Sequence, residues 1–123
     1  MTDDLISVLV IEDEPLSRKL IFHMLREAGY HVEVSVDGND ALERLKKEQF
    51  AVLLLDLKMP RLDGIMVTEQ LGRTNPELLA RTIIMTAFPD FLKEIDHDAI
   101  FGVLKKPFTP DTLLSAVERC AAL

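Results

Sequence analysis

The segment Ala51-Val-Leu-Leu-Leu-Asp56 decides the fold of this chain. Its short, uninterrupted apolar run is typical of a β-strand that is buried on both faces of a sheet. The run stops at a single carboxylate. Two further apolar runs also stop at charged residues, the first at Glu12 and Asp13 and the second at Lys105 and Lys106. Buried strands that each end in a charged residue suggest one site assembled from several strand ends.

The rest of the chain alternates between apolar runs and amphipathic segments. The apolar runs are rich in Val, Ile and Leu and cover Leu5–Ile11, His31–Val36, Ala51–Leu55, Arg81–Thr86 and Ile100–Leu104. Helical patterns occupy residues 15–28, 39–48, 64–73 and 110–121. The interval Pro89–Asp98 is so short that its helix must be short or irregular. Five strands alternating with five helices predict an α/β fold, a doubly wound five-stranded parallel sheet flanked by five helices.

The ends of two helical segments carry clear signals. Pro15 suits the first turn of a helix, where its missing N–H would be unpaired anyway, and Gly29 ends that segment. The residues at helical spacing between them are Leu16, Leu20, Met24 and Ala28. A cap at Thr109 followed by proline starts the last helix. We expect this helix to turn inward Leu113, Val117, Cys120 and Ala121.

The composition limits the class of protein. At 123 residues we expect one domain, spanning residues 1–123, with a core of its own. A net charge of −7 argues against direct binding to nucleic acid or to an anionic membrane, because either needs a basic surface. The single cysteine, Cys120, excludes an internal disulfide, and no apolar stretch approaches the ~20 residues of a membrane span. The acidic N-terminus does not resemble a signal peptide, so we expect a cytoplasmic protein.

The polar residues at the strand ends have the chemical character of a binding site. Because the carboxyl ends of parallel strands lie at one edge of a sheet, we expect five side chains to meet there: Glu12, Asp13, Asp56, Thr86 and Lys106. Three crowded carboxylates repel one another unless a cation neutralises them. Magnesium prefers oxygen ligands and is usually held by one or two carboxylates together with phosphate oxygens. The set therefore predicts Mg²⁺ beside a phosphoryl group.

Asp56 is the best candidate for a nucleophile in such a site. A carboxylate can attack phosphorus and form an aspartyl-phosphate, and phosphoryl transfer depends mainly on positioning and charge neutralisation. We expect Lys106 to bring a cation to one phosphate oxygen and Thr86 a hydroxyl donor to another. The backbone N–H of Ala87 would make a third contact, and its small side chain leaves room for the group.

Four motifs resemble the signatures of two-component response-regulator receiver domains. The segment Asp56-Leu-Lys-Met-Pro60-Arg-Leu-Asp-Gly64 looks like the phosphorylation loop of that family. The other three motifs follow the family's order and are Glu12-Asp13, Thr86-Ala87 and Lys106-Pro107-Phe108. The resemblance covers essentially the whole chain and implies a flavodoxin-like receiver fold and a phosphorylation-dependent signalling switch.

The resemblance also implies specific ligands and partners. It implies Mg²⁺ bound by Glu12, Asp13, Asp56 and the backbone carbonyl of Lys58, and phosphate transfer to Asp56 from a sensor histidine kinase or a phosphotransfer protein. Leu57, beside the aspartate, is assigned with Ala87 to the phosphate contacts. The Lys106–Pro107 bond is expected to be cis. We expect no enzymatic activity beyond self-catalysed phosphotransfer and dephosphorylation, and a monomer or a phosphorylation-promoted dimer that acts on a downstream protein.

The chain departs from the family pattern at three places. Val103 stands where the family commonly has a Tyr or Phe, so no aromatic ring is available there to turn inward on activation. The stretch between Thr86 and Lys106 is about two residues shorter than usual. Lys58 and Phe88 occupy two variable positions beside the site that tune phosphoryl lifetime in the family.

Other functions stay open at this stage. A degenerate receiver would act only as a constitutive protein-interaction module, which Val103 and the short fourth interval favour and the acid cluster opposes. An enzyme on the same fold is less compatible with the residues: a flavin site needs a Ser/Thr-rich loop where Glu12, Asp13 and Glu14 stand, and a phosphohydrolase needs a second acid where Lys58 stands. The chain ends after its last helix, as in a stand-alone receiver or phosphate shuttle, and equally as in the regulatory front end of a longer regulator with an enzymatic output.

Overall fold

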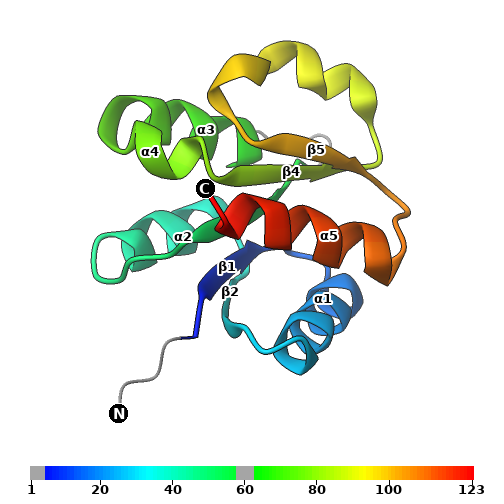
Figure 1. Cartoon of the computed structure of the whole chain (residues 1–123). Helices are drawn as coiled ribbons and strands as arrows, with labels where there is room; N and C mark the ends of the chain where they lie inside the picture. Colours follow the sequence, from blue (N-terminus) through cyan, green and yellow to red (C-terminus); the bar gives the residue numbers. More distant parts are fainter. Residues whose placement is uncertain (1–4, 58–62) are drawn as a thin grey trace.

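The computed structural model describes residues 5–57 and 63–123, and within them strands and helices alternate from one end to the other (Figure 1). Their order is β1 (Ser7–Ile11), α1 (Pro15–Glu27), β2 (His31–Ser35), α2 (Gly38–Leu45), β3 (Val52–Asp56), α3 (Asp63–Thr74), α4 (Pro76–Leu79), β4 (Thr82–Thr86), the 3₁₀ turns η1 (Pro89–Glu94) and η2 (His97–Ala99), β5 (Gly102–Lys105) and α5 (Pro110–Ala121). No helix in these two ranges has the length and apolar character that a membrane crossing requires.

The five strands form one parallel sheet in the order β2-β1-β3-β4-β5. The chain builds outward from β1 to one edge and then from β3 to the other, so the strand order reverses between β1 and β3. In open α/β sheets, ligands bind in the crevice outside the carboxyl ends of the strands at this reversal. The predicted doubly wound α/β fold is confirmed.

Helices cover both faces of the sheet, which explains why the strands are almost wholly apolar. The cluster on one face packs α1 and α5 against the sheet, and that on the other packs α2, α3 and α4 against it (Figure 1). On α5 the buried residues include Leu113, Val117 and Cys120, as predicted, and Ala121 packs against the same cluster while partly exposed. The two helix layers leave the carboxyl ends of the strands open as a separate edge.

Helix α1 buries a different stripe from the one that the spacing indicated. Its buried residues are Ile21 and Leu25, whereas Leu16 is 64% and Leu20 54% exposed. The ends of the helix are as expected: Pro15 lies in the first turn, and Gly29 adopts a φ of 100°, a left-handed conformation that favours glycine at a helix end.

Two features of the connections differ from a simple alternation. The single turn α4 lies before β4 and was not predicted; Asn75 caps it by accepting the N–H of Leu78 at 3.2 Å, and Pro76 follows the cap. Between β4 and β5 the chain forms only the turns η1 and η2, so the expectation of a short or irregular fourth helix is confirmed.

Strand alternation is interrupted just before β5. Phe101 packs against the cluster under α1 and α5, while Val103 packs against the opposite cluster. Two residues that are two positions apart in a regular strand would share a face. The side chain of Phe101 therefore does not substitute for an aromatic residue at position 103.

Candidate functional site

Three carboxylates meet where the strand order reverses. Glu12 and Asp13 follow β1 directly, and Asp56 is the last residue of the adjacent strand β3. Each offers a carboxylate oxygen, and these oxygens all lie within 4.8 Å of one another. The side chain of Glu12 is fully buried and that of Asp56 is only 7% exposed. Oxygen ligands at this spacing fit a divalent cation.

Lys106 directly follows β5, and its side chain reaches the carboxylates that follow or end β1 and β3. Its Nζ donates to Glu12 Oε1 at 2.9 Å and lies 3.2 Å from Asp56 Oδ1. The backbone fixes the start of this side chain, because the Lys106 N–H donates to the Thr86 carbonyl at 2.8 Å. The Lys106–Pro107 bond is cis, as expected. One cation therefore bridges two buried acids.

The electrostatics of the cluster raise the pKa of Asp56 from 3.8 to about 6. Burial is the main cause and repulsion from Glu12 the second, while Lys106 acts in the opposite direction. The pKa of Lys106 is also raised, because burial is outweighed by its hydrogen bond to Glu12 and by the charge of Asp56. Lys106 thus stays cationic beside three carboxylates that lie close enough together to repel one another. A divalent cation would balance them.

Thr86 ends β4 beside this cluster, and its hydroxyl is already engaged. Thr86 Oγ1 accepts the N–H of Phe88 at 2.9 Å and donates to the Leu57 carbonyl over 3.5 Å. The residue is 1% exposed, whereas Ala87, which follows it, is exposed. The hydroxyl therefore joins the end of the sheet to the start of the β4–β5 connection.

The structure does not confirm two of the predicted ligands, Leu57 and Lys58. Leu57 is 2% exposed and its N–H donates to the Met85 carbonyl at 2.9 Å, so this N–H continues the sheet ladder in the present arrangement. Lys58, whose carbonyl was assigned to the metal, lies outside the described residues.

Further residues support the acids without being predicted from the sequence. Arg18 on α1 donates through Nη1 to the carbonyls of Glu12 and Asp13, at 3.1 and 3.3 Å. The Glu14 N–H donates to Glu12 Oε2 at 3.2 Å. The contact of Arg18 could have been predicted from an arginine near the start of a helix that directly follows an acid pair.

Gly64 allows α3 to approach the end of β3. A Cβ at this position would meet the Leu57 side chain and would lie 3.0 Å from the Asp56 carbonyl oxygen. Such a distance is closer than Cβ atoms normally come to other atoms, so glycine is required here for packing.

A parallel five-stranded sheet with an acid cluster and a lysine at its switch point is the architecture of a receiver domain. The family model described as "Response regulator receiver domain" matches residues 8–118. The chain therefore belongs to the response-regulator receiver family and is a receiver domain of two-component signalling.

Individual relatives agree with this assignment. The response regulator receiver protein CpdR of Brucella abortus is 34% identical over 114 residues, which cover 91% of this chain and 93% of CpdR. Among solved structures, the chemotaxis response regulator CheY4 of Vibrio cholerae superposes with a TM-score of 0.82 at 30% identity, covering 94% of this chain and 98% of that one. Several other curated relatives are longer, and the chain spans only 12% to 54% of them.

A third relative belongs to a kinase. The receiver domain of the sensor histidine kinase PA1611 of Pseudomonas aeruginosa, solved with a magnesium ion coordinated in the active site cleft, has a TM-score of 0.85 at 26% identity, and the match covers 97% of this chain and 99% of that domain.

Proposed function

We propose that Asp56 accepts a phosphoryl group from a histidine of a sensor kinase or phosphotransfer protein, and that this changes the affinity of the domain for a downstream protein. The observation that carries the proposal is the contact of one lysine with both Glu12 and Asp56 at the switch point of the sheet. In the transfer, a bond forms between a carboxylate oxygen of Asp56 and phosphorus, and the bond between phosphorus and the donor's nitrogen breaks.

The residues present fit a magnesium ion. Glu12, Asp13 and Asp56 would hold it, together with the backbone carbonyl of Lys58. The magnesium ion coordinated in the active site cleft of the PA1611 receiver domain supports the choice of metal. Bound Mg²⁺ would neutralise charge that develops on the phosphoryl oxygens. The three carboxylates each offer an oxygen within 4.8 Å of the others, and a divalent ion would offset their mutual repulsion.

The other residues hold the phosphoryl group. Lys106 would move its contact from the Asp56 carboxylate to a phosphoryl oxygen while it keeps Glu12. Thr86 would donate its hydroxyl to a second oxygen, and the exposed Ala87 would donate its backbone N–H to a third. Leu57 would contribute only if its N–H left the Met85 carbonyl. We propose that the chemistry of the site is limited to phosphotransfer to Asp56 and hydrolysis from it, and that the domain is a switch rather than an enzyme.

The Thr86 hydroxyl offers a route from the site to the surface. It now accepts the N–H of Phe88, whose residue is 50% exposed. When Thr86 turns toward a phosphoryl oxygen, this hydrogen bond is lost, and the change reaches the start of the β4–β5 connection. Such a route does not require an aromatic side chain at Val103.

The phosphodonor has an apolar surface to dock on beside the site. A groove of about 420 Å³ reaches from Lys106 to α1 and is lined by Ser17, Leu20, Ile21, Met24, Ala87, Lys106, Pro107 and Phe108. The exposed side chains of Leu16 and Leu20 extend along the same helix. A helix of the donor placed here would bring its histidine toward Asp56.

The test is the mass of the intact protein after incubation with acetyl phosphate and Mg²⁺. We expect one added phosphoryl group on the wild-type protein and none on Asp56→Asn or in EDTA. If the protein gains no phosphate, or gains it equally in the variant, Asp56 is not the acceptor. The alternative is a constitutive interaction module, favoured by Val103, which would bind its partner equally with and without the phosphoryl analogue beryllofluoride.

A further inference from the structure

We propose that a second groove, between α3 and the β4–β5 connection, binds a basic amphipathic segment of a partner protein. The groove has a volume of about 510 Å³, within the range of pockets that bind ligands. Its lining comes from α3, from α4 and the residue after it, and from the stretch between the end of η1 and the residue after η2. The lining residues are Thr68, Glu69, Gly72, Pro76, Leu79, Ala80, Glu94, Ile95, Asp96, Asp98, Ala99 and Ile100.

The groove exists because of two local features. First, the β4–β5 connection is built from 3₁₀ turns and reaches the core mainly through Ile95 and Ile100, which are 7% and 8% exposed. Second, α3 has a glycine on the facing wall: a Cβ built at Gly72 would meet only Leu79 Cδ2, at 3.7 Å. The connection and the helix therefore leave a hollow between them.

The lining combines an apolar floor with an acidic rim. The floor is made by Gly72, Leu79, Ala80, Ala99 and Ile100.

The rim carries four exposed acids, Glu69, Glu94, Asp96 and Asp98. In the part of the chain that the structure describes, none of these four carboxylates forms an ion pair with a lysine or arginine, and none of the lining residues is basic. A partner segment with apolar side chains flanked by lysines or arginines would complement this surface. Its apolar side chains would pack on the floor, and its cationic side chains would pair with the acids of the rim.

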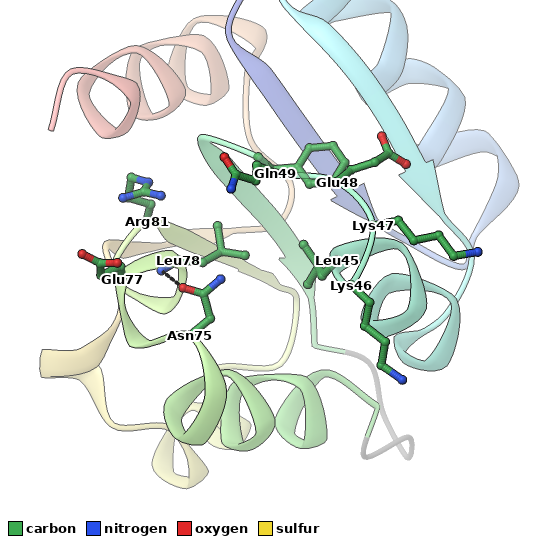
Figure 2. Close-up of a pocket in the computed structure, with 10 residues that line it drawn as sticks. Leu45, Lys46, Lys47, Glu48, Gln49, Asn75, Glu77, Leu78 and Arg81 are labelled. Atoms are coloured by element: carbon green, nitrogen blue, oxygen red, sulfur yellow. Dashed lines mark hydrogen bonds between the residues drawn. The ribbon is translucent and has the colours of Figure 1, made fainter.

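A groove of similar size, which is also lined in part by α4 and extends toward the end of α2, lacks this character. It has a volume of about 450 Å³ and is lined by basic residues and acids together, among them Lys46, Lys47, Glu48, Glu77 and Arg81. Figure 2 shows the three basic side chains pointing in different directions rather than toward a common point. The acidic character of the proposed groove is therefore not shared by this second groove.

The proposed groove shares no residue with the phosphoryl site. Its binding is therefore measurable on the unphosphorylated protein, and a failure here leaves the role of Asp56 untouched.

The test is a titration of the ¹⁵N-labelled full chain, followed by NMR, with an acetylated and amidated decapeptide of sequence KLAKLAKLAK. We expect saturable shifts confined to residues 68–80 and 94–101, with a Kd below about 1 mM. A peptide with serine in place of each leucine should bind at least about tenfold more weakly, because it cannot fill the apolar floor.

Two protein variants separate the groove from general charge attraction. Glu69→Lys with Glu94→Lys should weaken binding at least about tenfold, whereas Glu27→Lys with Glu43→Lys, which changes the net charge equally, should leave it within about twofold. Gly72→Leu fills the hollow and should also abolish binding. Absent or scattered shifts, equal losses in the two double variants, or equal affinity of the serine peptide would each overturn the proposal.

Discussion

Replacing Asp56 by asparagine should stabilise the metal-free protein at neutral pH. The buried, negatively surrounded carboxyl of Asp56 has its pKa raised from 3.8 to about 6. Above pH 6 the folded protein therefore holds an ionised group in a place that disfavours the charge. A shift of about two pKa units corresponds to about 3 kcal/mol, and the residual solvent access of the side chain reduces this to about 2 kcal/mol. The asparagine has a similar shape and no charge.

The raised pKa of Asp56 also predicts how the stability difference between the two proteins changes with pH. Between pH 3.8 and 6 the folded state binds more protons at Asp56 than the unfolded state does, so the contribution of this residue to stability falls as the pH rises through that window. Urea unfolding in EDTA should therefore show the wild type and Asp56→Asn nearly equal near pH 4 and about 2 kcal/mol apart at pH 7.5. Mg²⁺ should close the gap by stabilising only the wild type.

An exposed acid serves as the control. Asp90→Asn should change the stability by less than about 0.5 kcal/mol at either pH. The reasoning is refuted if Asp56→Asn is less stable than the wild type in EDTA at pH 7.5, or if its advantage does not depend on pH.

Three further substitutions test the packing and charge of the site. Gly64→Ala should destabilise the fold by about 1 to 3 kcal/mol in urea unfolding, because its Cβ meets Leu57 and the Asp56 carbonyl; an unchanged midpoint would contradict the required close approach. Gly72→Ala has room and a helical backbone, so calorimetry should show a gain of about 0.5 to 1 kcal/mol, and a lower melting temperature would contradict it. Lys106→Met should cost about 2 to 3 kcal/mol at pH 7.5 in EDTA, because it leaves two buried acids without their cation; wild-type stability would show that the contact is of little consequence.

The sequence predicted the sheet and the edge that carries the site because both depend on local patterns. Uninterrupted apolar runs mark strands covered on both faces, and the charged residue after each run is then placed by topology. Glu12, Asp56 and Lys106 needed no further information to be brought together. The strength of their electrostatic interaction could not be predicted, because it depends on how deeply each side chain is buried in the folded chain.

The departures arise where two local patterns compete. Helix α1 has apolar residues on more than one stripe, and packing against the sheet selects Ile21 and Leu25 while Leu16 and Leu20 stay exposed. The cap and proline before α4 were readable signals, but a single helical turn has no periodicity of its own. The change of side at Phe101 depends on where β5 begins, which alternation alone does not fix.

The route by which the site could act on the surface could not be predicted from the sequence either. The substitution of Val103 for an aromatic residue was visible, but the hydrogen bond from the Phe88 N–H to the Thr86 hydroxyl was not. This bond depends on the path of the chain after β4.

The central claim is that Asp56 is the residue that becomes phosphorylated. The most direct measurement treats the protein with acetyl phosphate and Mg²⁺, reduces it with borohydride, which converts an aspartyl-phosphate into homoserine, and locates the product by peptide mass spectrometry. The account predicts homoserine at position 56, dependent on Mg²⁺. Homoserine at another acidic position, or none at position 56 after treatment, would contradict it.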